Sequence, residues 1–264
     1  MTIVVKVGGA AGNELGPVLD EIALRPDAVL VHGGSEEIDR IGSALGRPPR
    51  YYTSPSGAVS RFTDAAHLET VILALAGSVQ TRIVRELAVR GARAVGLSGV
   101  DGGLVVARRK EGVRAIEGDR VVHLTDDRSG SIESIRTDLL ERLREGGYTP
   151  VVGPPAITPQ GEVVNVDADR IAARIAAALR AESLVLLTNV GGLRRVADDP
   201  LSVMGRIDRG NEAAALSAAQ GRMHKKVRAA IEAVHAGVPR AIIAASSGPG
   251  PIARALAGEG TVFA

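Results

Sequence analysis

The most constraining feature of this chain is its alternation of short β-branched runs with longer Ala-, Leu- and Arg-rich stretches of helical period. That alternation is typical of α/β proteins, in which helices cover a largely parallel sheet. The short runs predict strands at residues 3–7, 28–31, 94–97, 149–152, 183–187 and 240–244. The longer stretches predict helices at residues 36–45, 65–90, 131–145, 168–181, 223–236 and 251–257.

Two stretches, residues 50–61 and 104–123, interrupt the alternation and predict β-hairpins, the second with Gly112 and Gly118 as turn residues. No Pro- or Ser-rich linker divides the chain, but its character changes near Arg180. We therefore predict one continuous domain with two lobes, residues 1–180 and 181–264.

Composition excludes several classes of protein. Because cysteine is absent, the chain has no disulfide, thiolate zinc site or cysteine nucleophile. A net charge of +2 and 2% aromatic residues argue against nucleic-acid binding. No apolar run approaches the roughly 20 residues of a membrane span, and the N-terminus lacks the features of a signal peptide. We expect a cytoplasmic protein that does not bind membranes.

Two predicted strands run directly into glycine pairs, Gly8-Gly9 and Gly33-Gly34. Open α/β sheets bind ligands at the carboxyl ends of their strands, and glycine lets backbone N–H groups approach an anion closely. A pair of tight strand–helix turns is the structural alternative. The repetition of the motif favours a phosphate site.

Lysine is rare here, because 28 of the 32 basic residues are arginine. Codon bias explains such a ratio, yet each remaining lysine offers a compact charge that arginine does not. Lys6 lies within a strand of Ile and Val, where an ammonium group is costly unless it has an anionic partner. It is therefore a sharper functional signal than the glycines.

Two further segments combine polar residues with a helix start. Asn165, Asp167 and Asp169 alternate before and within the predicted helix 168–181, so they either cap it or line a cleft. Lys225 and Lys226 lie at the start of the helix at 223–236, where the helix dipole opposes cations unless an anion binds. A solvated helix face is the alternative. The five histidines show no metal-binding spacing, so we predict no metal site made by the protein.

Together these motifs resemble the amino acid kinase family, and within it acetylglutamate kinase and its carrier-protein-linked relatives. The resemblance spans nearly the whole chain. It runs from Lys6-Val7-Gly8-Gly9 through His32-Gly33-Gly34, Arg61, Asn165–Asp169 and Thr188–Leu193 to Gly221–Val227. It implies a three-layer αβα sandwich with a mainly parallel central sheet, an N-terminal lobe for the acid substrate and dimerisation, and a C-terminal lobe for ATP.

The resemblance also implies residue roles. Lys6 and Lys226 would neutralise charge on the transferred phosphoryl group, and Asp169 would orient both lysines. Backbone groups of Gly8, Gly9, Gly33 and Gly34 would surround the phosphate. Arg61 and Asn165 would hold the α-carboxylate end of the substrate. The nucleotide would contact Thr188, Asn189, Gly191, Gly192 and Leu193, and Mg²⁺ would arrive with ATP.

The chemistry agrees with these roles. A carboxylate with a pKa near ~4.3 is already an anion at neutral pH, so its attack on a phosphoryl group needs no general base. Catalysis then depends on positioning and electrostatic stabilisation, which lysines and glycine amides supply.

Several stretches, among them Ser98–Gly102, resemble the aminoadipate kinase branch, whose substrate is joined to a small acidic amino-group carrier protein. Residues on the two predicted hairpins would dock this carrier: Arg47, Arg50, Arg108, Arg109 and Lys110. A solvated basic rim is the alternative. Because the chain starts at its first strand, we expect a homodimer without the N-terminal helix of arginine-inhibited acetylglutamate kinases, and no arginine inhibition.

The function that this resemblance favours is ATP-dependent phosphorylation of the side-chain carboxylate of carrier-linked L-2-aminoadipate, or a close analogue. N-acetyl-L-glutamate kinase is the alternative, since one methylene is worth only about 1–3 kcal/mol of discrimination. A non-catalytic nucleotide or amino acid sensor is a third hypothesis. The presence of Lys6, Asp169 and Lys226 disfavours it, because a sensor needs none of them.

Overall fold

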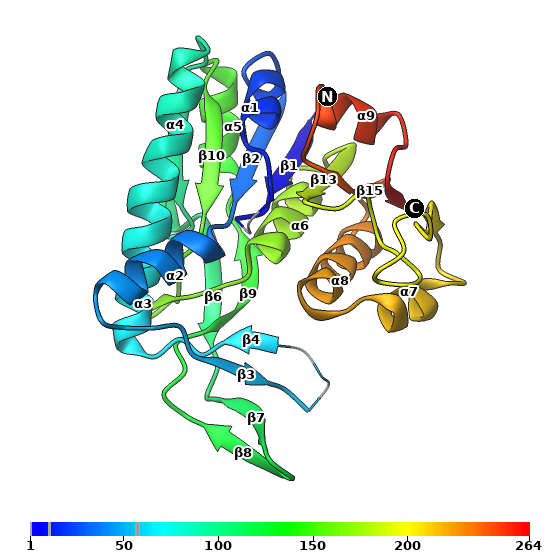
Figure 1. Ribbon diagram of the computed structural model, residues 1–264. Helices are drawn as coiled ribbons and strands as arrows, with labels where there is room; N and C mark the ends of the chain where they lie inside the picture. The colour runs from blue at the N-terminus through cyan, green and yellow to red at the C-terminus, as the bar shows by residue number, and fades with distance from the viewer. Residues whose placement is uncertain (1, 10–11, 56, 58) are drawn as a thin grey trace.

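The computed structural model describes residues 2–9, 12–55, 57 and 59–264. Eight strands in this part of the chain form the main sheet: β1 (Ile3–Val7), β2 (Ala28–His32), β5 (Ala94–Ser98), β10 (Thr149–Gly153), β13 (Ser183–Thr188), β14 (Arg206–Ile207), β15 (Ala241–Ala245) and β16 (Thr261–Phe263). Their spatial order is β14-β16-β15-β13-β1-β2-β10-β5 (Figure 1). Neighbours pair in parallel except β15 and β16. The mainly parallel sheet predicted from the sequence is confirmed.

Helices cover both faces of this sheet (Figure 1). One face packs against α5 (Asp138–Glu145), α6 (Ala168–Ala178), α7 (Glu212–Ala218) and α8 (Gly221–His235). The other packs against α1 (Gly16–Ile22), α2 (Ser35–Ala44), α3 (Ala65–Ile72), α4 (Gln80–Val89) and α9 (Pro251–Leu256). Strand β1 contributes to both cores, because Val4 faces the first layer whereas Ile3, Val5 and Val7 face the second. The result is the expected αβα sandwich.

Smaller sheets extend beyond the carboxyl ends of β1 and β2 (Figure 1). One contains β6 (Val105–Arg109), β9 (Gly130–Ile135), β11 (Ala156–Ile157) and β12 (Val163–Val164). Two hairpins, β3 (Tyr51–Thr53) with β4 (Val59–Arg61) and β7 (Val113–Glu117) with β8 (Arg120–Leu124), project below the main sheet. They therefore lie on the same side of the main sheet as the glycine pairs that follow β1 and β2.

Residues before and after Arg180 form two halves of one sheet. Strands β1, β2, β10 and β5 come from residues before Arg180, and β13, β15, β16 and β14 come from residues after it. The halves join where β1 pairs with β13 through five parallel residue pairs. Because this junction is a regular strand pairing, the lobes share a continuous core.

The predicted helix at residues 131–145 is wrong in its first half. Residues Gly130–Ile135 form β9, and α5 begins only at Asp138. A bulge in the β6–β9 pairing separates the inward-facing Ile132 from the next paired residues. The bulge gives Ile132 and Ile135 a spacing of three, which imitates a helical period.

The second predicted hairpin, at residues 104–123, is also wrong in its pairing. Strand β6 pairs with β9 and β11, so it is not part of a hairpin. The hairpin consists of β7 and β8, and Gly118 turns it with a φ of 59°. Gly112 lies before β7, where a Cβ would meet His123. The first hairpin, at residues 50–61, is confirmed.

The long helix predicted at residues 65–90 is interrupted. A π-helical segment, Leu73–Val79, separates α3 from α4. Helices α1 and α7, and strands β14 and β16, were not predicted. Within the described residues, no helix is both long and apolar enough to cross a membrane.

Candidate active site

Lys6 faces the helical layer that carries the other predicted catalytic residues. It alternates with Val4 along β1, so its side chain leaves the sheet on the side of α6 and α8. Its exposed fraction is only 5%, in a strand whose other residues are also buried. A charge in this position requires a nearby anion.

Asp169 provides that anion and bridges the two lysines. Its Oδ1 lies 2.6 Å from Lys6 Nζ, and Lys226 Nζ donates hydrogen bonds to Oδ1 at 3.0 Å and Oδ2 at 3.1 Å. Asp169 lies in the first turn of α6 and Lys226 near the start of α8, and these helices pack together. This group of two lysines and one aspartate, the lysine trio, is therefore brought together as predicted. Lys226 lies on a buried face of α8.

Burial and charge act in opposition in this trio. Burial would raise the pKa of Asp169, but Lys226 and Lys6 hold that pKa well below its usual range. Burial, opposed by the Asp169 carboxylate and reinforced by the charge of Lys6, lowers the pKa of Lys226 to about 8. The Asp169 carboxylate outweighs burial at Lys6 and raises its pKa. Two cations thus share one anion, leaving an excess of positive charge in the cavity.

The two glycine loops meet beside this trio. A Cβ on Gly9 would overlap the Cα of Gly34, so the two backbones touch only because both residues are glycine. Glu36 N–H donates to Gly9 O at 3.0 Å and fixes the loops to each other. A Cβ on Gly33 would lie 3.9 Å from Lys6 Nζ. Backbone amides and ammonium groups therefore border one space.

That space is a cavity of about 790 Å³. It is lined by Lys6, Gly8, Gly9, Asn13, Gly33, Gly34, Thr188, Asn189, Lys225 and Lys226, together with the start of α8. Three predicted nucleotide residues, Gly191, Gly192 and Leu193, do not line it; Leu193 N–H instead donates to Thr261 Oγ1 at 2.8 Å.

A second cavity, of about 440 Å³, shares Gly33, Gly34, Ser35 and Arg61 with the first and contains Asn165. Arg61 Nη1 lies 2.6 Å from Asp39 Oδ1. Asn165 Nδ2 donates to Thr63 Oγ1 at 3.2 Å. Both predicted substrate residues are thus held at a cavity that adjoins the lysine trio.

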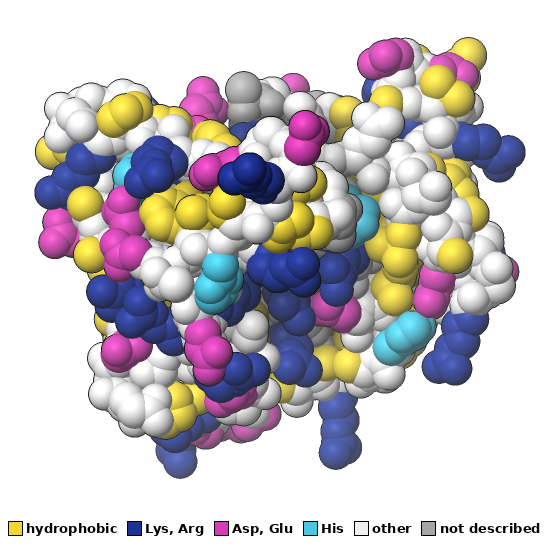
Figure 2. All heavy atoms as spheres, turned by 90° about the horizontal axis from the view of Figure 1, so that it is seen from below, with side chains coloured by type: hydrophobic (Ala, Val, Ile, Leu, Met, Phe, Trp, Pro, Cys, Tyr) yellow, Lys and Arg dark blue, Asp and Glu magenta, His cyan; other side chains and the backbone are white. Residues whose placement is uncertain are grey.

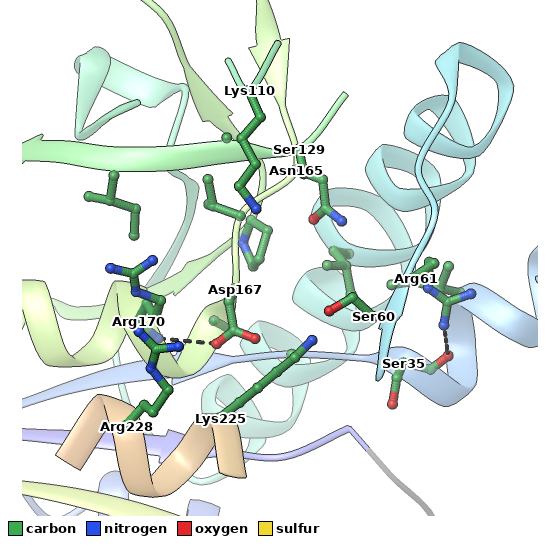
Figure 3. A pocket seen from close by; sticks show the side chains of 18 of the residues that line it. Ser35, Ser60, Arg61, Lys110, Ser129, Asn165, Asp167, Arg170, Lys225 and Arg228 are labelled. Carbon is green, nitrogen blue, oxygen red and sulfur yellow. Dashed lines mark hydrogen bonds between the residues drawn. The ribbon is translucent and has the colours of Figure 1, made fainter. Parts of the chain in front are cut away.

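The smaller cavity also gathers several cations, of which Lys225 lines the larger cavity as well. Figure 3 shows Lys110 and Lys225 entering the smaller cavity from opposite sides, with Arg170 and Arg228 nearby. In the described part of the chain, no carboxylate lies within ion-pair distance of Lys110, Lys225 or Arg228, whereas Arg170 pairs with Glu232 at 3.0 Å. Burial lowers the pKa of Lys110. Figure 2 shows the molecule from below the view of Figure 1, and Lys and Arg side chains gather near the centre of that face.

Every lysine of the chain therefore lines one of the two cavities. Asp167 does not need a ligand to explain its place, because its Oδ1 accepts from the N–H groups of Asp169 and Arg170 and caps α6. Of the three polar residues at 165–169, Asp167 caps α6 and also lines both cavities, Asn165 lines the smaller cavity, and Asp169 bridges the lysines.

The other predicted docking residues are engaged with the protein itself. Arg47 pairs with Glu69 at 2.9 Å, and Arg50 lies over the Phe62 ring at 4.8 Å. Arg108 pairs with Glu133 at 3.2 Å and Arg109 with Glu162 at 3.9 Å. Arg47 and Arg50 precede β3, and Arg108 and Arg109 lie on β6, so none lies on a hairpin strand.

Several cavity residues were missed by the sequence analysis: Tyr52, Ser54, Ser60, Ser129, Arg170 and Arg228. Arg228 had a detectable signal, because it follows Lys225 by three residues and so shares its helix face. Ser54 and Ser60 lie on the β3–β4 hairpin and Ser129 precedes β9, and these segments meet only in the folded chain. The described residues contain no cluster of three His, Cys, Asp or Glu side chains able to hold a metal.

Comparison with known proteins gives consistent relatives. The chain is 46% identical over 264 residues to a protein of Deinococcus radiodurans named LysW-aminoadipate kinase, covering 98% of this chain and 90% of the relative. It is 44% identical to a protein of the same name from Thermus thermophilus, covering 98% and 99%.

Solved structures give the same fold. The crystal structure of smu.665 from Streptococcus mutans superposes with a TM-score of 0.77 at 23% identity, covering 99% of this chain and 98% of that one. The family model of the amino acid kinases matches residues 1–245. With its lysine trio and paired glycine loops, the chain belongs to the amino acid kinase family.

Proposed function

We propose that this protein transfers the γ-phosphoryl group of ATP to the side-chain carboxylate of carrier-linked L-2-aminoadipate. A carboxylate oxygen attacks the γ-phosphorus, the bond from that phosphorus to the β–γ bridging oxygen breaks, and ADP leaves. The products are an acyl phosphate and ADP. The observation that carries this proposal is the Asp169 carboxylate holding Lys6 and Lys226 beside two glycine loops.

Each residue has a distinct role in this proposal. Lys6 and Lys226 neutralise charge that builds on the transferred group, and Asp169 orients them. N–H groups of Gly9 and Gly34 supply donors without side-chain obstruction. The N–H groups of Gly8 and Gly33 instead donate to Leu187 O and Val7 O at 3.3 Å, so these two glycines shape the loops. The acceptor is already ionised near neutral pH, so the reaction requires no protein base.

ATP fits the larger cavity, whose volume is about 790 Å³ and whose wall includes Thr188 and Asn189. Mg²⁺, carried by the phosphate oxygens, would neutralise part of their charge. Lysines and amides are the donor set for such phosphates, and the C-terminal lobe would hold the nucleotide. We assign no nucleotide contact to Gly191, Gly192 or Leu193. Their role would be to shape the loop that follows Thr188 and Asn189.

The smaller cavity suits the acid substrate. Arg61 and Asn165 would bind its α-carboxylate, with Arg61 oriented by Asp39. Among the described residues, no carboxylate lies within ion-pair distance of Lys110, Lys225 or Arg228, which favours a substrate or carrier with further carboxylates. The relatives named LysW-aminoadipate kinase support aminoadipate on a protein carrier.

Carrier docking would begin at the exposed arginines and end in this cavity. Arg47, Arg50, Arg108 and Arg109 would form a weak outer rim, since each is already engaged with the protein. Lys110 would contribute more because its charge faces the cavity. We also propose a cytoplasmic homodimer without arginine inhibition; light scattering and a kinetic assay with arginine test the assembly and the inhibition.

Hydroxylamine trapping of the acyl phosphate tests the activity. The acceptors are N-acetylglutamate, N-acetylaminoadipate, and an acidic carrier bearing aminoadipate or glutamate. We expect strong preference for carrier-bound aminoadipate. Efficient turnover of free N-acetylglutamate, with no gain from the carrier, would instead assign the protein as an N-acetylglutamate kinase. ATP binding without turnover of any acceptor would favour a sensor.

A further inference from the structure

A fully buried histidine lies directly behind the glycine loop of the larger cavity. His32 ends β2 and alternates with Ala28 and Leu30, so its ring points away from Lys6 and toward the α4 layer. It is 0% exposed and lines neither cavity. The proposed phosphoryl transfer makes no direct use of it.

The ring of His32 connects Gln80 to the loop. His32 Nε2 lies 3.2 Å from Gln80 Oε1, and His32 Nδ1 lies 3.4 Å from Gly33 O. Burial lowers the pKa of His32 and keeps the ring neutral, with one N–H and one lone pair. The Gln80 amide carries both a donor and an acceptor, so it can satisfy Nε2 in either tautomer.

Two strand glycines make room for this pair. A Cβ on Gly153 of β10 would lie 2.6 Å from the His32 ring, and a Cβ on Gly96 of β5 would lie 2.6 Å from Gln80 Nε2. Glycine weakens a strand interior and often marks a place where another group approaches closely. Here the group is the same buried pair at both positions.

The π-helical segment Leu73–Val79 positions Gln80 for this contact. One extra residue in a helix turns everything after it by about 100°. Leu75 and Val79 lie against Gly34, where a Cβ would be 2.6 Å and 2.9 Å from them, and Ser78 Oγ donates to Glu37 Oε1. Segments of π-helix are frequent at functional sites.

These contacts converge on one short piece of backbone. From His32 to Glu37, the loop is held from behind by Gln80, Val79, Ser78 and Leu75, while its front faces Lys6 and the larger cavity. Amide donors act on a developing anion only when their direction is fixed beforehand.

The Gly33 N–H donates to Val7 O at 3.3 Å, which leaves the next peptide to face the cavity. We propose that His32 and Gln80 are positioning residues, which hold the Gly33–Gly34 peptide so that the Gly34 N–H faces the transferred phosphoryl group. This inference rests on the proposed phosphotransfer and extends it to two residues that touch no substrate. The reason is geometric: within the described chain, the polar contact of the ring to the loop is with Gly33 O, the carbonyl of the peptide that contains the Gly34 N–H.

The test compares Gln80→Leu with Ile83→Val, a conservative change in the core of the same helix. For Gln80→Leu we expect kcat to fall at least tenfold while KM for the acid acceptor stays within twofold. Affinity for the ADP–Mg²⁺–aluminium fluoride complex should fall by the same factor, while affinity for ADP stays within twofold. Ile83→Val should leave all four values within twofold of the unsubstituted protein.

A kcat within twofold of the unsubstituted protein in folded Gln80→Leu would overturn the inference. Should Gln80→Leu fail to fold, His32→Asn and His32→Gln replace it, because Asn places its amide nitrogen near the position of Nδ1 and Gln near that of Nε2. We expect His32→Asn to keep at least fivefold more activity than His32→Gln. Equal loss in both would contradict a role through Gly33 O.

The fluoride complex separates this inference from the proposed function. It requires ADP and the glycine loop, but no acid acceptor. If the unsubstituted protein phosphorylates none of the offered acids, the proposed acceptor is wrong, and the fluoride measurement still decides the role of His32 and Gln80.

Discussion

The two cavities share a wall, yet they treat charge in opposite ways. In the larger one, Lys6 and Lys226 are almost completely buried and already bound by Asp169 at 2.6–3.1 Å. In the smaller one, Lys110 and the shared Lys225 are partly buried and Arg228 is exposed. None of these three has a carboxylate within ion-pair distance in the described chain. The first is organised before any ligand arrives, whereas the second is completed by its ligand.

This difference follows from the elements that build each cavity. Central strand β1 and helices α6 and α8 hold the lysine trio, and each is fixed by core packing. The smaller cavity combines α6 and α8 with the β3–β4 hairpin and the β6–β9 sheet, which lie outside the main sheet. Rigid elements suit transition-state stabilisation, and peripheral elements suit docking of a large acidic partner.

Asp169→Asn should produce the largest effect, because it leaves two buried ammonium groups without their shared anion. We expect about 10³-fold lower kcat and a free energy of unfolding lower by about 3–5 kcal/mol. Hydroxylamine trapping and urea unfolding measure the two effects. Asp126→Asn, at an exposed position, is the control and should change neither. Full activity in Asp169→Asn would contradict the view that the larger cavity depends on a preorganised lysine trio.

Lys226 gives the next largest effect and a pH signature. Lys226→Ala should lower kcat about 10²–10³-fold with little loss of ATP affinity. Arg85→Ala is the control, because the Arg85 side chain lies on the exposed face of α4, and it should not lower kcat. A variant that binds ATP and keeps full turnover would remove Lys226 from the catalytic set.

The pH dependence follows from the lowered pKa of Lys226, about 8. Because the charged form is the active one, kcat/KM for ATP should fall as pH rises through 8. In Lys226→Arg the guanidinium stays charged, so the fall should disappear between pH 8 and 10, even if the plateau is lower. An unchanged alkaline limb in Lys226→Arg would assign the titration to another group.

Lys110→Gln tests the ligand-completed cavity. We expect KM for the carrier-linked acceptor to rise about tenfold, with kcat within twofold, because the lost charge contributes about 1–1.5 kcal/mol to binding only. Arg108→Gln is the matched control, since Arg108 is exposed and paired with Glu133. Equal effects from both variants would indicate that the outer rim, rather than the cavity, recognises the carrier.

Ionic strength should give the smallest effect. Raising salt from 50 to 300 mM should increase KM for the carrier-linked acceptor severalfold, because partly exposed charges are screened. The value of kcat should change less than twofold, since the lysine trio is buried. Comparable salt sensitivity of kcat would remove the distinction between the two cavities.

Much of this architecture was predictable from local patterns. Strands β1, β2, β10 and β13 are short apolar runs, and their alternation with stretches of helical period identified them. The predictions failed where contacts with other elements altered the local structure. The β9 bulge imitated helical spacing. The π-helical segment leaves no signal in a sequence whose pattern predicts one helix from Ala65 to Arg90.

The candidate site divides in the same way. Lys6 and Lys226 were identifiable because an ammonium group in an apolar strand and a lysine near a helix N-terminus are each unfavourable without an anion. Asp169 was identifiable only as one of three alternating polar residues, since an acid at a helix start is itself favourable. Tyr52, Ser60 and Ser129 were not identifiable, because a hydroxyl group carries no such local cost. The assigned nucleotide glycines were adjacent in sequence to cavity residues but do not line the cavity.

By itself, the sequence determined the alternating α/β order, the glycine pairs and the unusual lysines, since each depends on neighbouring residues. Only the tertiary structure decided that all four lysines meet at two adjoining cavities and that Lys110 differs from Arg108 and Arg109. It also placed Gln80 against His32, 48 residues away. Such contacts join residues that are far apart in the sequence. They depend on how strands pair and helices pack, which no single local pattern encodes.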